Sequence, residues 1–383
     1  MNTREGFHTG KVMLISFGHL VHDTYSSFLA PLLPLLIEKF SLSYSLASLL
    51  GLLQRLPNLL NPFLGLLADR MGMRWLVILS PSITAIAMSL AGLAPTYTVL
   101  AILLLITGIS TALFHVPTPV MVRKVSGDQI GKGMSWYMFG GEIARTVGPL
   151  MVLGAVSLWG LEGIWKLIPL ALASSVLLYI KLRRIKISDE FRNKDDISGL
   201  KDTFRRSMPF FILMTGITFF RSVMRASLTT FLPTYMTLKG ESLWTGGVFL
   251  SVLELSGAAG TLFWGYYSDR IGRRKALMII LYSAPVLMFL FSIMNGWASL
   301  PVLAILGFFL LGTTPILLAL TQDRGSERPA FFNSMFLTVS FASEAAAVMI
   351  AGGLADWIGL DMTFHLSGII SIGAIPFVYM LKK

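Results

Sequence analysis

The chain has 383 residues, of which 54% are hydrophobic and only 13% are charged, and it contains no cysteine. A soluble domain carries about 25% charged residues, so this chain has more apolar surface than its own core can bury, and we expect it to span a membrane. The lack of cysteine excludes disulfides and thiolate metal sites. The net charge of +11 does not indicate nucleic-acid binding, because the basic residues lie in short turns where they set membrane orientation.

Twelve apolar segments are long enough to cross a bilayer, which takes about 20 helical residues. The first is too long for a signal-peptide core and lacks a small-residue cleavage site, so we expect it to stay as a membrane helix. We predict an all-α integral membrane protein with six-helix bundles over 1–182 and 207–383, joined by a charged linker over 183–206. An amphipathic surface helix near 189–204 is an option. The expected helices cover 11–37, 45–68, 75–94, 97–122, 131–159, 163–182, 208–237, 243–267, 275–295, 299–321, 329–356 and 362–381.

Lysine and arginine gather on one side of the predicted membrane. They occupy both ends of the chain, the linker and the turns that follow the second, fourth, eighth and tenth predicted helices. The other side has Lys39, Lys166 and Lys239. Positive residues mark the cytoplasmic side of a membrane protein. We therefore expect both termini in the cytoplasm, in a multi-pass protein of a prokaryotic inner (plasma) membrane.

One motif occurs twice, and it indicates a duplicated chain. The first copy reads Gly65-Leu-Leu-Ala-Asp69-Arg70-Met-Gly72-Met-Arg74, and the second, 200 residues later, reads Gly265-Tyr-Tyr-Ser-Asp269-Arg270-Ile-Gly272-Arg273-Arg274-Lys275. Each copy ends the second apolar segment of its half and begins a basic turn. Parallel six-helix halves related by an axis along the membrane normal are a known transporter plan.

The duplicated motif resembles the signature G-x-x-x-D-R-x-G-R-[KR] of the major facilitator superfamily, and the resemblance covers essentially the whole chain. The second copy fits fully, and the first has Met73 where arginine is usual. For one copy alone, a generic turn with positive-inside charges is the alternative. The resemblance implies a transporter that works by alternating access between two bundles, with no cofactor. It also implies a conformational gate formed by Gly65, Asp69, Arg70, Gly72, Arg74, Gly265, Asp269, Arg270, Gly272 and Arg273.

Two further resemblances are narrower. Helix 1, with His19, His22 and Asp23 followed by two prolines, resembles the fosmidomycin-resistance branch of the superfamily, although asparagine is more usual where His22 stands. This implies efflux of a small, anionic compound. Gly148-Pro149 in helix 5 loosely resembles the Gly-Pro motif of antiporter members, and a glycine-rich packing face is the alternative.

Charged groups inside membrane helices are costly, at about 2.5–3.5 kcal/mol each on insertion scales, and they persist where they face a cavity or each other. Those of this chain lie on predicted helices 1, 2, 5, 7, 8 and 11, which line the central cavity of the resembled fold. Burial and alternating exposure can tune carboxyl and imidazole groups for proton transfer. The proton-coupling candidates are Asp23, His19, His22, Glu142, Glu254 and Glu344.

Arginine remains charged and makes bidentate contacts with carboxylate, phosphate or phosphonate groups. Arg221 and Arg225 have no carboxylate on their own helix, so one of them is our first choice for a substrate contact, and pairing with Glu254 or Glu344 is the alternative. Arg145 can instead neutralise Glu142, and Arg55 can neutralise Asp23. The full set of substrate-binding candidates is Arg221, Arg225, Arg55, Arg145, Gln54, Asn58, Tyr25, Tyr137 and His115.

These features favour a proton-coupled efflux transporter for a small organic anion, amphipathic compound or drug, with sodium as the other coupling ion to consider. The expected partners are a small-molecule substrate and membrane lipid, and we expect a monomer. An importer of an organic anion or sugar and a lysolipid flippase are the alternatives on the same fold. An enzyme is not expected, because the chain has no H-E-x-x-H, G-x-S-x-G or phosphate-binding loop and no metal-binding pattern.

Overall fold

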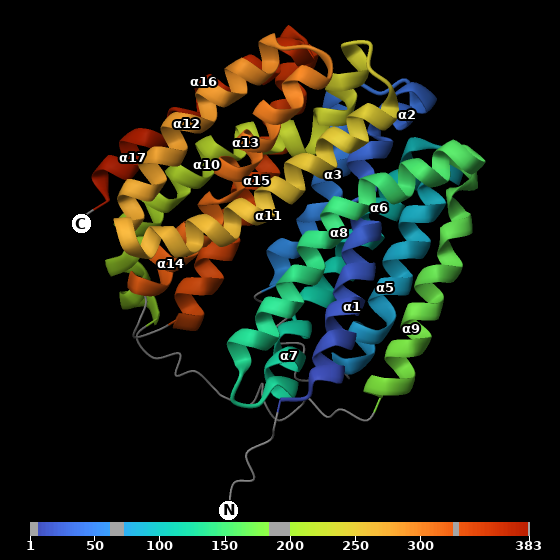
Figure 1. Cartoon of the computed structure of the whole chain (residues 1–383), viewed down its shortest axis with the longest axis horizontal. Coiled ribbons are helices and arrows are strands. Elements are labelled where there is room, and N and C mark those ends of the chain that lie inside the picture. Colours follow the sequence, from blue (N-terminus) through green and yellow to red (C-terminus); the bar gives the residue numbers. More distant parts are fainter. Residues whose placement is uncertain (1–6, 62–72, 184–199, 325–328, 382–383) are drawn as a thin grey trace, which may run out of the picture. The chain divides into compact units, whose positions relative to one another are not determined.

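The computed structural model describes residues 7–61, 73–183, 200–324 and 329–381. Every regular element in these ranges is helical (Figure 1). Eleven helical spans of the described residues, several of them made of consecutive elements, are long and apolar enough to cross a membrane, which confirms the predicted all-α membrane class. The other expected span, 45–68, falls partly on residues 62–72, outside the described part of the chain.

Two compact units make up the chain. Unit 1 consists of Met1–Leu36 and Leu53–Asp195, and unit 2 consists of Ile37–Leu52 and Asp196–Lys383. The exact bundle limits and the linker over 183–206 remain a prediction, because residues 184–199 lie outside the described ranges.

In unit 1, α1 lies at the centre of the packing and contacts α5, α8 and α9, while α5 also packs on α6 (Figure 1). Helices α2 and α3 straddle the division between the units. The elements up to the linker are α1 (Thr9–Ser26), α2 (Leu29–Phe40), α3 (Tyr44–Arg55), η1 (Leu56–Leu60), α5 (Met73–Leu90), η2 (Ala91–Leu93), α6 (Tyr97–His115), α7 (Thr118–Ser126), α8 (Ile130–Trp159), η3 (Leu161–Leu167) and α9 (Ile168–Leu182).

In unit 2, α10 takes the central place and packs on α11, α15 and α16, while α11 packs on α13. This repeats the role of α1 in unit 1, as expected of a duplicated chain. The elements are α10 (Leu200–Leu238), α11 (Leu243–Ile271), α12 (Arg273–Ile293), η4 (Gly296–Ser299), α13 (Leu300–Leu311), α14 (Thr313–Arg324), α15 (Pro329–Ile358), α16 (Leu360–Ser371) and α17 (Ala374–Met380).

Several expected single helices are interrupted, and proline explains where. A proline lacks the backbone N–H and its ring clashes with the carbonyl four residues earlier. The predicted helix 97–122 breaks between α6 and α7 at Pro117, and its counterpart 299–321 breaks between α13 and α14, three residues before Pro315. The helix expected at 11–37 breaks between α1 and α2, ahead of Pro31. The break after α6 leaves His115 at the end of its helix.

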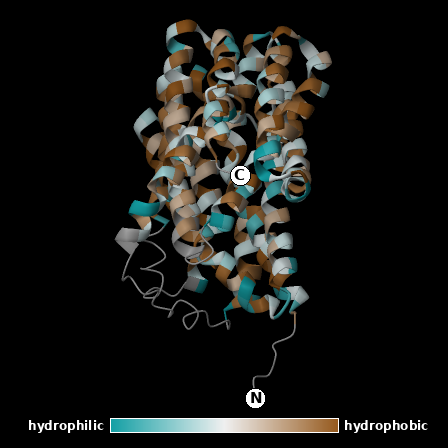
Figure 2. Cartoon of the chain, turned by 90° about the vertical axis from the view of Figure 1, so that its left-hand side faces the viewer, coloured by the Kyte–Doolittle hydropathy of each residue, from teal (hydrophilic) through white to brown (hydrophobic). Residues whose placement is uncertain are grey.

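The outer surfaces of the helices are apolar. Large hydrophobic side chains such as Leu158, Leu262 and Trp357 are 74%, 76% and 81% exposed, and Figure 2 shows hydrophobic residues along the length of the helices. Exposed apolar surface on this scale fits contact with lipid. Exposed tryptophans also lie at helix ends on the side with few basic residues, as in the aromatic belts of membrane proteins; they are Trp159, Trp165, Trp244, Trp297 and Trp357.

Candidate functional site

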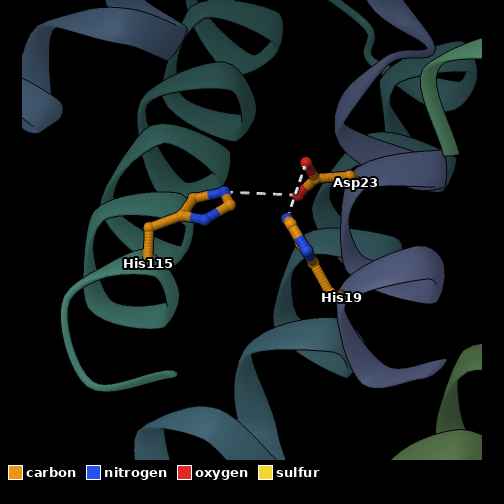
Figure 3. Close-up of side chains that lie close together, drawn as sticks. All are labelled: His19, Asp23 and His115. Atoms are coloured by element: carbon orange, nitrogen blue, oxygen red, sulfur yellow. Dashed lines mark ion pairs between the residues drawn. The ribbon is translucent and has the colours of Figure 1, made fainter. Parts of the chain in front are cut away.

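A cluster of three histidines surrounds the carboxylate of Asp23 inside unit 1. His19 Nε2 lies 3.2 Å from Asp23 Oδ2, and His115 Nε2 lies 3.3 Å from Asp23 Oδ1. Figure 3 shows the His19 and His115 rings meeting the carboxylate from two helices, α1 and α6. The structure thus brings together the leading proton-coupling candidate and His115, which was predicted as a substrate contact.

His22 completes the cluster from the buried side. Its Nδ1 lies 2.8 Å from Asp23 Oδ1, and its Nε2 lies 3.0 Å from Thr84 Oγ1 on α5. The ring stacks on Phe114 with 4.4 Å between the centroids. With its side chain fully buried, His22 is held on both nitrogens and on its face.

Tyr137 on α8 fixes the other two histidine rings. Its backbone carbonyl lies 2.7 Å from His19 Nδ1, and its hydroxyl lies 3.2 Å from His115 Nδ1. The phenol ring stacks on the His19 imidazole with 4.0 Å between the centroids. Tyr137 was predicted to touch substrate, whereas the structure places it, 3% exposed, as a support of the Asp23 cluster.

The sequence of α8 explains how α1 approaches so closely. A Cβ atom at Gly140 would lie 2.5 Å from the Ser16 carbonyl oxygen, and one at Gly141 would lie 2.5 Å from His19 Cε1. Only glycine fits such contacts, as small residues allow close helix packing in membranes. The glycine-rich stretch of α8 therefore forms a packing face against α1.

The other candidates of unit 1 have separate partners. Arg145 pairs with Glu142 one turn earlier on α8, which is the pairing alternative for this arginine. The ion pairs that the structure shows for Asp23 among the described residues are with His19, His22 and His115. Gln54 Nε2 donates to the Ser26 carbonyl at 2.6 Å. Tyr25 donates to the Leu167 carbonyl at 2.6 Å, and Asn58 is 7% exposed on η1.

Unit 2 holds two arginines one helical turn apart on α10, and their environments differ. Arg225 pairs with Glu344 on α15, one of the two pairings considered from the sequence. Arg221 is 2% exposed and donates from Nη1 to Thr313 Oγ1 at 2.7 Å, with Thr314 Oγ1 at 3.5 Å. Its Nε has no hydrogen-bond partner, and no carboxylate of the described residues lies within ion-pair distance of it. Glu254 is half-buried on α11.

The gate predicted from the duplicated motif is described only in its second copy. Gly65, Asp69, Arg70 and Gly72 lie outside the described residues, and Arg74 lies over the Trp75 ring at 5.8 Å.

In the second copy, Asp269 pairs with Arg273 at 2.6 Å, and Arg273 Nε reaches Asp323 Oδ2 at 3.4 Å at the end of α14. Arg270 donates to Tyr266 on its own helix. Gly272 takes a positive φ of 92° at the turn into α12, and a Cβ atom at Gly265 would touch Pro315 at 3.5 Å. Arg273, rather than Arg270, thus bridges separate elements in unit 2.

Sequence reasoning missed the neutral partners of the charged groups. Thr84, Thr313 and the Tyr137 carbonyl carry no pattern that singles them out. It also missed a network near the Trp297 end of unit 2, where Tyr235 Oη lies 3.0 Å from Asp361 Oδ1 and Lys239 Nζ donates to the Ser292 carbonyl at 2.6 Å. Lys239 and Asp361 flank helix ends, so their charges were the available signal.

The arrangement of apolar helices around buried ionisable groups defines a polytopic membrane protein, and comparison with known proteins gives its family. The family model of the Major Facilitator Superfamily matches residues 15–347. The chain therefore belongs to the major facilitator superfamily, whose members are transporters.

Individual relatives are distant. The chain is 23% identical over 363 residues to the fosmidomycin resistance protein of Escherichia coli (strain K12). This alignment covers 94% of this chain and 89% of that protein. A bacterial homolog of the human lysosomal transporter Spinster, solved inward-facing and occupied, superposes with a TM-score of 0.82 at 13% identity, covering 98% and 96% of the two chains. The D-xylose-proton symporter superposes with a TM-score of 0.78 at 13% identity, covering 99% and 98%. These two solved structures have the same fold as this chain.

Proposed function

We propose that the chain is a secondary transporter that exports a small organic anion or amphipathic drug in exchange for protons by alternating access. It would act in a prokaryotic inner membrane with both termini in the cytoplasm. The likeness to the fosmidomycin resistance protein supports efflux. The buried arginine of unit 2 supports an anionic substrate, and the Asp23 cluster of unit 1 supports proton coupling.

Arg221 is the observation that carries the substrate class. Its guanidinium is buried and remains charged, whereas the neighbouring Arg225 is already neutralised by Glu344. An isolated buried charge is unfavourable unless it is paired and hydrogen-bonded. Thr313 and Thr314 supply hydroxyl oxygens but no negative charge, so an anionic group of the substrate would complete the site.

The Asp23 cluster is the observation that supports protons as the coupling ion. A carboxylate with three imidazole groups in hydrogen-bonding distance can gain or lose a proton without a large rearrangement of its neighbours. Sodium prefers a set of oxygen ligands, and nitrogen-rich surroundings are poorly suited to such hard cations. The composition of the cluster therefore favours a proton.

Ligand-induced stabilisation tests the substrate class. Purified protein is heated with organic anions including fosmidomycin, with sugars and with cationic drugs, because a ligand that binds the folded state raises the melting temperature. We expect anions alone to stabilise the wild type, and Arg221→Lys to lose that stabilisation. Arg183→Lys, a surface variant near the Tyr179 ring, is the matched control and should respond as the wild type. The proposal would be contradicted if sugars or cationic drugs stabilised the wild type and stabilised Arg221→Lys equally well.

A further inference from the structure

The carboxylate of Asp23 faces a histidine nitrogen that carries no hydrogen when the ring is neutral. The Tyr137 carbonyl oxygen, 2.7 Å from His19 Nδ1, can only accept a hydrogen bond, so Nδ1 carries the hydrogen. A neutral imidazole has one ring hydrogen, and His19 Nε2 therefore turns a bare lone pair toward Asp23 Oδ2 at 3.2 Å. Two acceptor atoms at this distance repel each other unless a cation binds both.

His22 repeats this arrangement at the other carboxylate oxygen. Thr84 Oγ1 donates to Ser110 Oγ at 2.9 Å, and Ser110 donates to the Ser80 carbonyl at 3.1 Å. The hydrogen of the Thr84 hydroxyl is thus used, so His22 Nε2 donates to Thr84 at 3.0 Å. In the neutral ring, His22 Nδ1 then presents its lone pair to Asp23 Oδ1 at 2.8 Å. The two imidazoles and the carboxylate form an electron-rich pocket that attracts a cation.

His115 adds a third imidazole from a second helix, α6. Its Nε2 lies 3.3 Å from Asp23 Oδ1, and its Nδ1 lies 3.2 Å from the Tyr137 hydroxyl. A hydroxyl oxygen can accept the Nδ1 hydrogen, which leaves Nε2 bare. Figure 3 shows the His19 and His115 rings turned toward the carboxylate. Ligand atoms of His19, Asp23 and His115 all lie within 4.8 Å of one another.

We propose that His19, Asp23 and His115 bind a divalent transition-metal ion of the zinc class. Imidazole nitrogen suits Zn²⁺, Co²⁺ and Ni²⁺, whereas Mg²⁺ and Ca²⁺ prefer oxygen ligands. Two histidines and one carboxylate, with a fourth position open, form a known zinc ligand set. Ligand atoms that lie about 2.0–2.1 Å from a tetrahedral zinc ion are about 3.3 Å apart, which matches the 3.2 and 3.3 Å from His19 and His115 to the Asp23 oxygens.

The surroundings of both rings fit this assignment. A metal-bound histidine usually donates its other N–H to an oxygen atom, which fixes the ring and its tautomer. Tyr137 supplies that oxygen to both rings, the carbonyl to His19 and the hydroxyl to His115. The side chains of His19 and Asp23 are 5% and 12% exposed, whereas that of His115 is 31% exposed. The ligands are therefore held in place, and the His115 side leaves a path by which an ion can enter.

A bound ion should inhibit transport. This consequence rests on the proposed function, whereas binding of the ion does not. The ion would occupy the carboxylate and the imidazole nitrogens that proton coupling would use. We expect saturating Zn²⁺ to abolish substrate accumulation driven by a pH gradient in wild-type proteoliposomes, and a chelator to restore it. Unchanged accumulation at full zinc occupancy would overturn the inhibitory role.

Zinc binding by purified, full-length protein without a histidine tag tests the site. Equilibrium dialysis with elemental analysis should find one zinc ion per chain. We expect His115→Ala and Asp23→Asn to raise the Kd at least about tenfold, since even outer partners of metal ligands contribute about 10–100-fold. His365→Ala is the matched control, because His365 Nε2 lies 3.7 Å from Asp361 Oδ2 in a separate histidine–aspartate pair, and it should bind as the wild type. No saturable binding by the wild type, or equal binding by all three variants, would overturn the proposal.

Cobalt gives a second measurement that needs no variant. Tetrahedral Co²⁺ with nitrogen and oxygen ligands absorbs visible light far more strongly than the hydrated ion. We expect the wild type to develop these bands and to lose them when excess Zn²⁺ is added. A cobalt spectrum equal to that of the free ion would overturn the site, even if transport is proton-coupled. Saturable metal binding by a protein whose transport ignores the pH gradient would support the site and remove the proposed function.

Discussion

At the scale of single residues, the function depends on the surroundings of a few buried charges. Asp23 accepts from histidines on two helices, Arg225 is matched by Glu344, and Arg221 has only threonine hydroxyls. The sequence predicted Asp23 with His19 because residues four apart share a helix face. It could not predict that His115 joins them, since that contact depends on how α6 packs in the unit.

Asp23→Asn tests the central carboxylate. Asparagine keeps the size of the side chain but cannot ionise, so we expect loss of gradient-driven transport with retention of the folded state. Proteoliposome uptake measures the first and a melting curve measures the second. Asp361→Asn is the control, because Asp361 also lies one turn from a histidine, with Asp361 Oδ2 3.7 Å from His365 Nε2, yet it is remote in sequence from the cluster. Full coupling in Asp23→Asn would remove this residue from the mechanism.

At the scale of elements, glycine decides how closely helices approach. The sequence marked the glycines of α8, but whether they bend the helix or pack it was open. The structure shows contacts with α1 at Gly140 and Gly141, whereas a Cβ atom at Gly154 would meet nothing within 4 Å. The prolines after His115 indicated a bend in the fourth predicted helix, but the full break at Pro117 and the one ahead of Pro315 do not show in the hydropathy, which runs unchanged through them.

Gly141→Ala should disturb the cluster from the neighbouring helix. The added methyl group would lie 2.5 Å from His19 Cε1, so the ring must leave its present position beside Asp23. We expect reduced pH-driven transport with little loss of folded protein, measured side by side with Gly154→Ala. Equal transport by the two variants would show that the position of the His19 ring does not matter.

A second glycine pair tests helix packing in unit 2. The Asp356 carboxylate on α15 accepts from the backbone N–H groups of Tyr44 and Ser45 at 2.7 and 2.9 Å, and thereby caps α3. A Cβ atom at Gly352 would lie 2.6 Å from the Tyr44 carbonyl oxygen, whereas one at Gly353 would meet nothing within 4 Å.

We expect Gly352→Ala to lower the free energy of unfolding by about 1–3 kcal/mol, as overpacking does. Gly353→Ala should be neutral or slightly stabilising, since alanine is favoured over glycine in helices by about 1 kcal/mol. Melting temperatures in detergent compare them. A lower melting temperature for Gly353→Ala than for Gly352→Ala would contradict the packing described for α3 and α15.

At the scale of the whole molecule, the sequence predicted the membrane class and the duplication well, because both depend on composition and repetition that need no packing detail. The family match confirms the superfamily. The substrate was less accessible, since it depends on which buried charges neutralise each other. Arg221 and Arg225 look alike in the sequence, and only the position of α15 distinguishes them.

Substrate accumulation in proteoliposomes under an imposed pH gradient tests proton-coupled export most directly. For an antiporter, a lumen more acidic than the medium should drive an organic anion inward as protons leave, and nigericin should abolish the accumulation. A passive weak acid would not gather in an acidic lumen. Accumulation only when the medium is the more acidic side, and in excess of that in protein-free liposomes, would instead show symport. Accumulation that is indifferent to the gradient would contradict proton coupling altogether.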